Sequence, residues 1–448
     1  MKFRRSIPGL VSFFQSFFHS NIAGGILLLL STIFAILAAN IPALSGFHNF
    51  WNIEAGFHAG DLSVSMSLRN WVNDGLMAVF FFLVGLEIKR ELLVGELSSP
   101  KKAMLPMFAA LGGMIFPALI YTLFNWGTPT QNGWGIPMAT DIAFAIGVLS
   151  LLGKSCPIGL KVFLTALAIV DDIGSIIVLA IFYPTNELQL MYLLYAAVVV
   201  LILVLFNRLR IKHVIAYLVP GLFLFIFFFK SGIHATIAGV ILAMTIPAKS
   251  SINEVRYYVS TKRLLEKFKK AGNGEVQVLA NNEQLDLINR LARNSNSINP
   301  LVHKLEEELH PWVHFLIMPI FALANAGVAI DGSVFSNSPL PPVMKGIFFG
   351  LFLGKPIGIF LFSWLAVKLK LAQLPKNTTW IQILLLGIVG GIGFTMSIFI
   401  DNLAFTNQAF IDEGKLAILV TSCVSAIVGV IALKLLYKFT KNKEVINQ

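Results

Sequence analysis

The sequence predicts an all-α membrane protein of twelve transmembrane helices, on three observations. The 448-residue chain is 56% hydrophobic, whereas soluble domains have roughly 45–50% apolar residues. The apolar residues gather in stretches of about 20 residues, the length of a helix that crosses ~30 Å of hydrocarbon. Basic residues alternate between poor and rich loops. An open sheet is excluded because its edge groups would stay unpaired in lipid.

The predicted spans follow from the apolar stretches in chain order. They cover residues 22–43, 75–95, 103–124, 136–152, 159–183, 190–207, 211–229, 233–248, 312–330, 344–367, 380–401 and 416–437.

The loop charges give the orientation. Lys2, Arg4 and Arg5 precede the first span, whereas the loop after it holds only Arg69. The same alternation continues to the C-terminus, and the 249–311 loop carries ten basic residues. This positive-inside pattern predicts a multi-pass membrane protein with both termini cytoplasmic. The net charge of +11 is thereby explained without a nucleic-acid partner.

Two long connections interrupt what we interpret as one transporter domain, residues 1–448. Residues 44–74 face outside, and the alternation of apolar residues over 62–68 predicts a short strand, half of a β-hairpin. Such a hairpin is either a dimer contact or an ordered loop. Residues 249–311 form a charged cytoplasmic loop with three helix-like pieces, and they lack a Gly-rich phosphate loop.

The fourth and eleventh spans are interrupted near their middles by Gly, Pro or Thr. Spans 3–5 and 10–12 run in opposite directions, as an inverted-topology repeat requires. Broken helices at matching positions of two repeats indicate a transport site at the membrane midplane. Close helix packing explains Gly390, Gly391 and Gly393 equally well, but it does not explain Thr140 beside Asp141.

Four charged residues inside predicted spans carry the chemistry: Asp141, Asp171, Asp172 and Lys355. A carboxylate at the bilayer centre costs about 2.5–3.5 kcal/mol on insertion scales, so such residues usually mark ion or proton pathways. The neighbouring Asp171 and Asp172 repel one another, which favours protonation of at least one and couples their titration. Oxygen ligands also suit small hard cations. A site that holds either a proton or Na⁺ is an exchanger, and Thr140 can add a hydroxyl oxygen.

Helix geometry assigns different partners to the two neighbours. Adjacent residues point about 100° apart, so one of Asp171 and Asp172 is free to bind the ion while the other pairs with Lys355. We also expect Asp141 and Lys355 to offset the partial charges of broken-helix ends. The alternative for Lys355 is a purely structural ion pair.

A second group of titratable residues lies near the inner membrane surface. Glu87, Arg90 and Glu91 share one helix face, and we expect Glu306, Glu307, Glu308 and His310 to join them. This group is either a pH-sensitive funnel or an ion network at a helix end.

His234, near the outer end of the eighth span, has an ordinary pKa of about 6.5. It is either pH-sensitive or simply hydrogen-bonded.

Six stretches resemble the signatures of NhaA-type Na⁺/H⁺ antiporters across residues 10–440. They are MATDIAFAIG, LTALAIVDDIG, GKPIGI, GIGFTMSIFI, VFFFLVGLEIKRELL and KSGIHATIAG. The resemblance implies a twelve-helix antiporter of a bacterial inner membrane, often dimeric through an outer β-hairpin, in which broken helices 4 and 11 cross. It also implies electrogenic export of Na⁺ or Li⁺ against H⁺ that is more active at alkaline pH.

The resemblance also implies residue roles. Asp172 is the expected cation ligand with Thr140 nearby, and Asp171 is the expected partner of Lys355 and a proton carrier. Asp141 matches the acid near the crossing. The pH-sensing residues it implies are Glu87, Arg90, Glu91, Glu306 and His234.

Two features depart from the family pattern. The 249–300 loop is longer and more charged than expected, and Asp401 stands where a small neutral residue is expected. We expect Asp401 near the outer mouth, where it would attract cations.

Other functions fit less well, and no cofactor is expected. An intramembrane aspartyl protease needs two carboxyls that face each other, usually from different helices, whereas Asp171 and Asp172 are adjacent. A symporter for an organic solute would need aromatic or amide side chains beside the acids, where the sequence has chiefly Ala, Ile, Leu and Val. Nothing suggests the continuous polar stripe of a passive channel.

Overall fold

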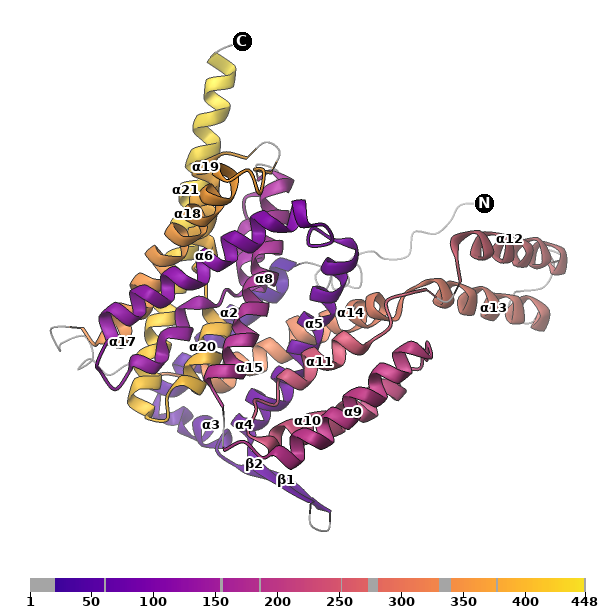
Figure 1. Cartoon of the computed structure of the whole chain (residues 1–448), viewed down its shortest axis with the longest axis horizontal. Coiled ribbons are helices and arrows are strands. Elements are labelled where there is room, and N and C mark those ends of the chain that lie inside the picture. Colours follow the sequence, from indigo (N-terminus) through magenta and orange to yellow (C-terminus); the bar gives the residue numbers. More distant parts are fainter. Residues whose placement is uncertain are drawn as a thin grey trace.

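The computed structural model describes residues 21–59, 62–153, 156–184, 187–250, 252–272, 281–329, 340–375 and 378–446. These residues fold mainly as helices, as predicted, and the helices pack into one bundle (Figure 1). The basic N-terminus on which the orientation partly depends lies outside the described residues.

The first part of the chain forms one long helix, a short two-stranded sheet and a second long helix. Its elements are α2 (Asn21–Asn40), η1 (Pro42–Leu44), α3 (Ser45–Phe50), β1 (Glu54–Ala59), β2 (Leu62–Ser67), α4 (Leu68–Asn70), η2 (Trp71–Leu76) and α5 (Met77–Val94).

The strands β1 and β2 pair antiparallel, with Glu54 opposite Ser67 and Ala59 opposite Leu62. The indole Nε1 of Trp71 donates to the carbonyl oxygen of Ala55 at 2.7 Å, which ties the strands to the start of α5. Figure 1 shows the sheet at the end of the molecule opposite the C-terminus.

Two groups of helices share one order, in which a bent span lies between two long ones. The first group is α6 (Pro100–Asn125), η3 (Gln131–Met138), α7 (Ile142–Ser150) and α8 (Ile158–Phe182). The second is α17 (Pro342–Phe349), η7 (Gly350–Gly354), α18 (Lys355–Lys368), α19 (Trp380–Gly390), α20 (Phe394–Ala404) and α21 (Gln408–Ile446).

The bends fall where the sequence predicts broken spans. The chain turns by 40° between η3 and α7 and by 52° between α19 and α20. At the second bend, a Cβ on Gly391 would lie only 2.5 Å from the carbonyl oxygen of Leu351, so a side chain does not fit there.

The remaining helices connect the two groups. They are α9 (Leu190–Arg208), α10 (Ile215–Ser231), α11 (Ile237–Thr245), α12 (Glu254–Ala271), α13 (Asn282–Ile298), α14 (Leu301–Trp312), η6 (Val313–Ile317) and α15 (Met318–Asn325).

Length and composition support fewer spans than the twelve predicted. Among the described residues, six helices are long and apolar enough to cross a membrane, and eight if each bent pair is one span. The other predicted spans correspond to α5, α10, α11 and η6 with α15. These helices are shorter or carry more charge. Helix α11, for example, has only nine residues, whereas the predicted span covered 233–248.

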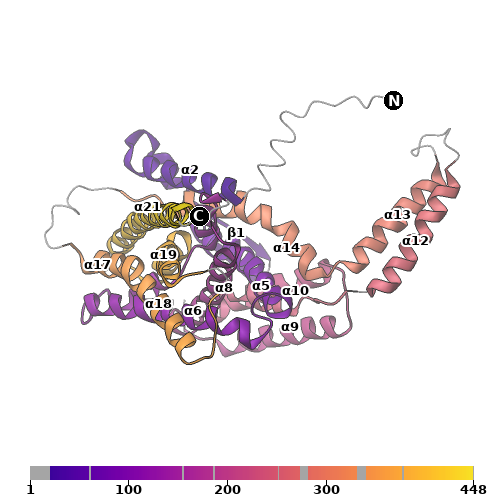
Figure 2. The ribbon, with the colours of Figure 1, turned by 90° about the horizontal axis from the view of Figure 1, so that it is seen from above.

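The charged connection contains the helices that the sequence indicates. Helices α12 and α13 pack against each other, and Gln284 donates from its side chain to the carbonyl oxygen of Phe268 at 3.3 Å. Both views show this pair extending sideways from the bundle, whereas α14 returns to it (Figures 1 and 2).

Helices α6 and α18 approach closely at a pair of glycines. A Cβ on Gly112 would lie 2.1 Å from the carbonyl oxygen of Gly358, and the reverse distance is also 2.1 Å. Small residues allow such close packing of membrane helices. This contact fixes the start of α18, where Lys355 lies, against the bundle interior.

Candidate functional site

The two bends lie against each other in the middle of the bundle. The backbone N–H of Asp141 donates to the carbonyl oxygen of Ile392 at 2.8 Å. The hydroxyl of Thr140 lies 3.0 Å from the carbonyl oxygen of Gly390. Each break therefore supplies partners to the backbone groups that the other leaves without helical hydrogen bonds.

Asp141 joins the starts of two half-helices. It is the N-cap of α7, where its Oδ1 accepts from the backbone N–H of Phe144 at 3.0 Å. Its Oδ2 accepts from the hydroxyl of Thr395 and from the backbone N–H of Thr395 at 3.3 Å, at the start of α20. Helix N-termini carry partial positive charge, so the predicted position of an acid near these ends is confirmed.

Lys355 lies at the C-terminal end of η3, the other half-helix of this break. Its Nζ donates to the carbonyl oxygen of Met138, the last residue of η3. It also forms an ion pair with Asp171 Oδ2 at 2.8 Å, and both side chains are 0% exposed. The predicted pairing of Lys355 with one of the two neighbouring aspartates is therefore present.

Thr140 belongs to the same group. Its hydroxyl donates to Asp171 Oδ2 at 2.7 Å. The family resemblance implies Thr140 near Asp172, and the two residues line one cavity. The rotation between neighbours on α8 turns Asp171 toward the crossing, where Thr140 and Lys355 share one of its oxygens.

Asp172 is buried like Asp171, but its carboxyl lacks the partners that Asp171 has. It is 1% exposed, and neither carboxylate oxygen has a hydrogen-bond partner among the described residues. It lines a cavity of about 330 Å³ together with Thr140 and Asp141. An unpartnered buried carboxyl is costly when ionised, so Asp172 is suited to hold a proton or a cation.

The same cavity reaches a group of charged residues on α5 and α14. Its wall includes Glu87, Arg90, Glu306, His310 and His314. All of these except His314 were expected to form one titratable group, and the cavity connects this group with Asp172.

Ion pairs and ring stacking hold this group together. Arg90 forms ion pairs with Glu91 at 3.1 Å and with Glu306 at 2.9 Å. The rings of His310 and His314 stack with centroids 4.0 Å apart. Burial raises the pKa of Glu306 above its ordinary value, although the charge of Arg90 opposes this shift. Burial, with the charges of His314 and Arg90, lowers the pKa of His310 to about 4.

Several sequence candidates do not join this group. Glu307 and Glu308 pair instead with His303 and Lys304 on the exposed face of α14, at 3.4 and 3.8 Å.

His234 lies apart from the cavity wall. It is 1% exposed, with Nδ1 3.0 Å from the hydroxyl of Thr236 and Nε2 3.8 Å from Asp74 Oδ1. Its ring packs edge-on against Phe399 at 5.4 Å. Any effect of pH through His234 would therefore act at a place separate from Glu87 and Glu306.

Sequence reasoning missed two residues of this region, Thr395 and His314. Thr395 follows the GIGF stretch that was identified only as a break, and its side chain gives no signal of its own. His314 follows His310 by four residues, the spacing that places two side chains on one helix face, and this signal was available.

No group of three or more His, Cys, Asp or Glu within the described ranges is arranged to hold a metal ion. The Na⁺ ligands named from the sequence, Asp171, Asp172 and Thr140, therefore stay a prediction.

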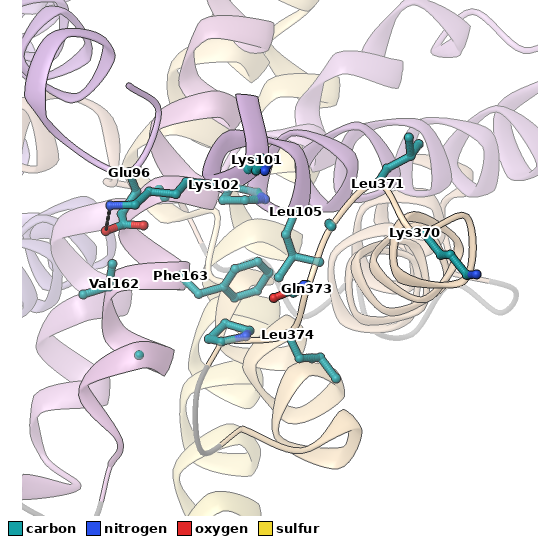
Figure 3. A pocket seen from close by; sticks show the side chains of 15 residues that line it. Glu96, Lys101, Lys102, Leu105, Val162, Phe163, Lys370, Leu371, Gln373 and Leu374 are labelled. Carbon is teal, nitrogen blue, oxygen red and sulfur yellow. Dashed lines mark ion pairs between the residues drawn. The ribbon is translucent and has the colours of Figure 1, made fainter. Parts of the chain in front are cut away.

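A larger cavity of about 770 Å³ lies elsewhere, between the starts of α6 and α8 and the segment after α18. Figure 3 shows Lys102 reaching across it toward Glu96, and these side chains lie 3.7 Å apart. Leu105 and Phe163 form part of its apolar wall. None of the acids or bases of the crossing lines it, so it is separate from the site described above.

The chain matches known proteins over almost its whole length. The family model described as "Na+/H+ antiporter 1" matches residues 15–433. A protein of Wolinella succinogenes named Na(+)/H(+) antiporter NhaA is 45% identical over 97% of this chain and 96% of its own length. Proteins with the same name from Helicobacter acinonychis and Helicobacter pylori strain G27 are 45% and 46% identical. They match over 98% and 95% of this chain, and over 99% and 95% of their own lengths.

Among solved structures, the sodium proton antiporter MjNhaP1 of Methanocaldococcus jannaschii overlaps with 93% of this chain and 91% of its own. Its TM-score of 0.48 and its identity of 13% are too low to support a conclusion.

Proposed function

The chain belongs to the NhaA-type Na⁺/H⁺ antiporter family, and we propose that it exchanges Na⁺ for H⁺ at Asp172. One observation carries the assignment of this residue. Asp172 faces the cavity with both oxygens unpartnered among the described residues, whereas Asp171 beside it is bound to Lys355 and Thr140. Competition between one cation and a proton for the same carboxylate then couples the two fluxes.

The exchange cycle follows from this competition. Protonated Asp172 releases its proton to the cavity and binds Na⁺ or Li⁺ there through carboxylate oxygens, which suit small hard cations. After the site opens to the other side, the cation leaves and a proton returns. Thr140, which also lines the cavity, supplies a hydroxyl oxygen when the Asp171 contact relaxes.

Asp171 and Lys355 are the second carriers of charge in this proposal. When Asp172 binds Na⁺, the local positive charge favours loss of a proton from Lys355 or Asp171. More protons than Na⁺ ions then cross per cycle, so transport is electrogenic and is driven by the proton gradient.

Glu87, Arg90, Glu91 and Glu306 set the response to pH. Because burial raises the pKa of Glu306, this carboxyl stays protonated to higher pH than an exposed glutamate does. As pH rises it ionises, which adds negative charge at the cavity mouth and attracts cations. This sign agrees with activation at alkaline pH. His234 with Asp74 adds a separate titratable contact.

Twelve spans with an inverted repeat, in an inner membrane with both termini in the cytoplasm, fit the basic loops and the two bent pairs. In this orientation the cavity opens inward beside α14, and residues 249–311 form a cytoplasmic extension. The paired strands of residues 44–74 face outside, where they contact a second copy of the chain. The spans, the paired strands and the cytoplasmic extension all belong to one transporter domain, residues 1–448.

Proton flux in sealed vesicles tests the function. An imposed proton gradient is monitored with a pH-sensitive dye and challenged with Na⁺, Li⁺ or K⁺ at mildly acidic and at alkaline pH. We expect Na⁺ or Li⁺ to dissipate the gradient with the wild type and not with Asp172→Asn, whereas Glu307→Gln on exposed α14 behaves as wild type. Absence of any cation effect with the wild type would contradict the assignment.

A further inference from the structure

Asp401 is a second buried acid, outside the site described above. It lies in the last turns of α20 and is 0% exposed. Neither of its carboxylate oxygens has a hydrogen-bond partner in the described part of the chain. Asp401 was expected near the outer mouth, and its carboxyl is covered there by α21 instead of being exposed.

The cover is a close contact with the start of α21. A Cβ on Gly414 would lie 2.0 Å from Asp401 Oδ1 and 3.0 Å from Oδ2, so the carboxyl rests directly on the Gly414 backbone. The next residue, Lys415, is 2% exposed. A buried carboxylate without hydrogen bonds is costly, and a buried charged pair repays its desolvation only with good geometry. The ionised form of Asp401 is therefore costly in these surroundings, and a proton on the carboxyl removes that cost.

The charged and titratable groups around Asp401 come from three elements. Lys415 and Asp412 on α21 interact with it electrostatically, and so does Tyr121 on α6. Arg69, on α4 after the paired strands, interacts with both Lys415 and Asp412. Asp401 and Lys415 are therefore a buried acid and a buried base that interact electrostatically without a direct contact, unlike Asp171 and Lys355, which form an ion pair at 2.8 Å.

Helix η3 accepts hydrogen bonds both from Lys355 and from α20, the helix that carries Asp401. Lys355 donates to the carbonyl oxygen of Met138, and the hydroxyl of Ser397 donates to that of Ile136 at 2.9 Å. Ser397 is 0% exposed and lies one helical turn, about 6 Å along the axis, before Asp401. Residues four apart lie on one helix face, so Ser397 and Asp401 share this contact surface.

The end of α20 that carries Asp401 is close to the protein surface. The backbone N–H of Phe405 donates to the carbonyl oxygen of Asp401 at 3.3 Å, which closes the last turn of α20. Thr406, Asn407 and Gln408, which follow directly, are exposed. Asp401 is therefore about one turn from water on the side that the loop charges place outside the cell.

We propose that Asp401, poised by Lys415, is the outer proton-relay residue that delivers protons toward the Asp171–Lys355 pair. This proposal rests on Na⁺/H⁺ exchange as the function and adds the route by which its protons arrive. In the outward-open state, Asp401 takes a proton from external water onto a carboxylate oxygen. The proton passes by way of the Ser397 hydroxyl to Lys355 or Asp171, and Asp401 returns to the carboxylate beside Lys415.

The test varies the pH on the outer side alone. Proteoliposomes of one orientation, selected by protease access to the α12–α13 pair, are held at a fixed inner pH. The exchange rate and the KM for Na⁺ on the inner side are then measured. For Asp401→Asn we expect a rate loss on the order of 100-fold at alkaline outer pH, the low end of general acid–base effects. The loss should shrink at acidic outer pH, the inner KM should stay unchanged, and Asp401→Glu should restore the rate.

Two further variants distinguish a relay from a structural role. Lys415→Met removes a positive charge that favours the carboxylate, so the outer-pH midpoint should rise by about 1–3 units. Glu307→Gln, on the exposed face of α14 and away from Asp401, should leave the rate within about twofold of wild type.

Two results would overturn the proposal. One is an outer-pH dependence of Asp401→Asn that equals that of the wild type. The other is an equal loss at every outer pH. Both differ from failure of the exchange function itself, in which the wild type would show no Na⁺-dependent flux at any pH.

Discussion

Asp171 and Asp172 follow one another on α8, but they belong to two regions that are built differently. The crossing of the broken helices surrounds Asp171 with Lys355 and Thr140, and each of these also bonds a backbone carbonyl of a broken helix. The cavity wall leaves Asp172 without a partner among the described residues. One region thus has nearly all its hydrogen bonds formed inside the protein, and the other keeps a carboxylate available for cargo.

This contrast explains why two adjacent carboxylates are useful. A rotation of about 100° per residue turns them toward different neighbours without any loop between them. Because the two carboxyl groups are adjacent, a change in the charge of one changes the proton affinity of the other. The pair therefore connects the transported cation to the ion pair that holds the crossing together.

The largest effect is expected when the ion pair at the crossing is broken. Lys355→Met leaves Asp171 buried without its base, which should lower the free energy of unfolding by about 3–5 kcal/mol. The double variant Asp171→Asn/Lys355→Met should recover most of this loss, because no unpaired charge then stays buried. Thermal unfolding in detergent measures both variants. A single variant as stable as the wild type would show that the pair does not hold the crossing.

The contact between the two breaks should give a smaller effect. Thr395→Val removes the hydroxyl that donates to Asp141 Oδ2, and hydrogen bonds to charged groups are worth about 1.5–3 kcal/mol. The control is Thr122→Val, whose hydroxyl bonds only the Ala118 carbonyl of its own helix at 2.8 Å. Equal thermal stability of the two variants would contradict a special role of Thr395.

Substitutions in the cavity wall should change the pH dependence of exchange more than they change the stability of the protein. Glu306→Gln keeps residue 306 neutral, so the rise in exchange rate toward alkaline pH should weaken by about two- to tenfold, the effect of roughly 0.4–1.4 kcal/mol. The raised pKa of Glu306 also means that its contribution to stability is lost as pH rises through that value. The variant should lose this pH dependence of stability.

Glu307→Gln is the matched control, because the Glu307 side chain is 65% exposed. It should keep the pH profile of the wild type. If both variants shift the profile equally, the general charge of α14 matters and the specific position of Glu306 does not.

The smallest effect is expected when α12 and α13, which lie outside both regions, are removed. Joining Asn253 to Asn299 removes α12 and α13, of which α12 has no buried residue and α13 only Gln284 and Leu287. Removal of such exposed backbone should leave the exchange rate within about twofold of wild type. Flux measurements on the shortened chain check this, and a loss comparable to that of Glu306→Gln would assign the extension a role in pH sensing.

Local sequence patterns predicted the parts of the site that depend on helix geometry. Charges inside apolar spans identified Asp141, Asp171, Asp172 and Lys355, and interrupted spans identified both bends. The choice of Asp171 as the partner of Lys355 first came from family resemblance. Periodicity cannot decide between two neighbours when the base is 184 positions away in the chain.

The parts that sequence could not predict depend on how distant segments pack. Thr395 contacts Asp141 only because the two breaks meet. Asp401 was expected near the outer mouth, but its position after an apolar stretch gives no information about the cover that α21 provides. The count of twelve spans came from apolar stretches and was supported by the loop charges, whereas helices α11 and α15 are too short to be recognised as spans by length alone.

Direct Na⁺ binding tests the central claim about Asp172. Isothermal titration of Na⁺ into purified protein at alkaline pH compares the wild type, Asp172→Asn and the neutral double variant Asp171→Asn/Lys355→Met. We predict binding heat for the wild type and the double variant and none for Asp172→Asn. Binding that survives in Asp172→Asn but is lost in the double variant would contradict the account, because the cation would then depend on the crossing and not on the free carboxylate of the cavity.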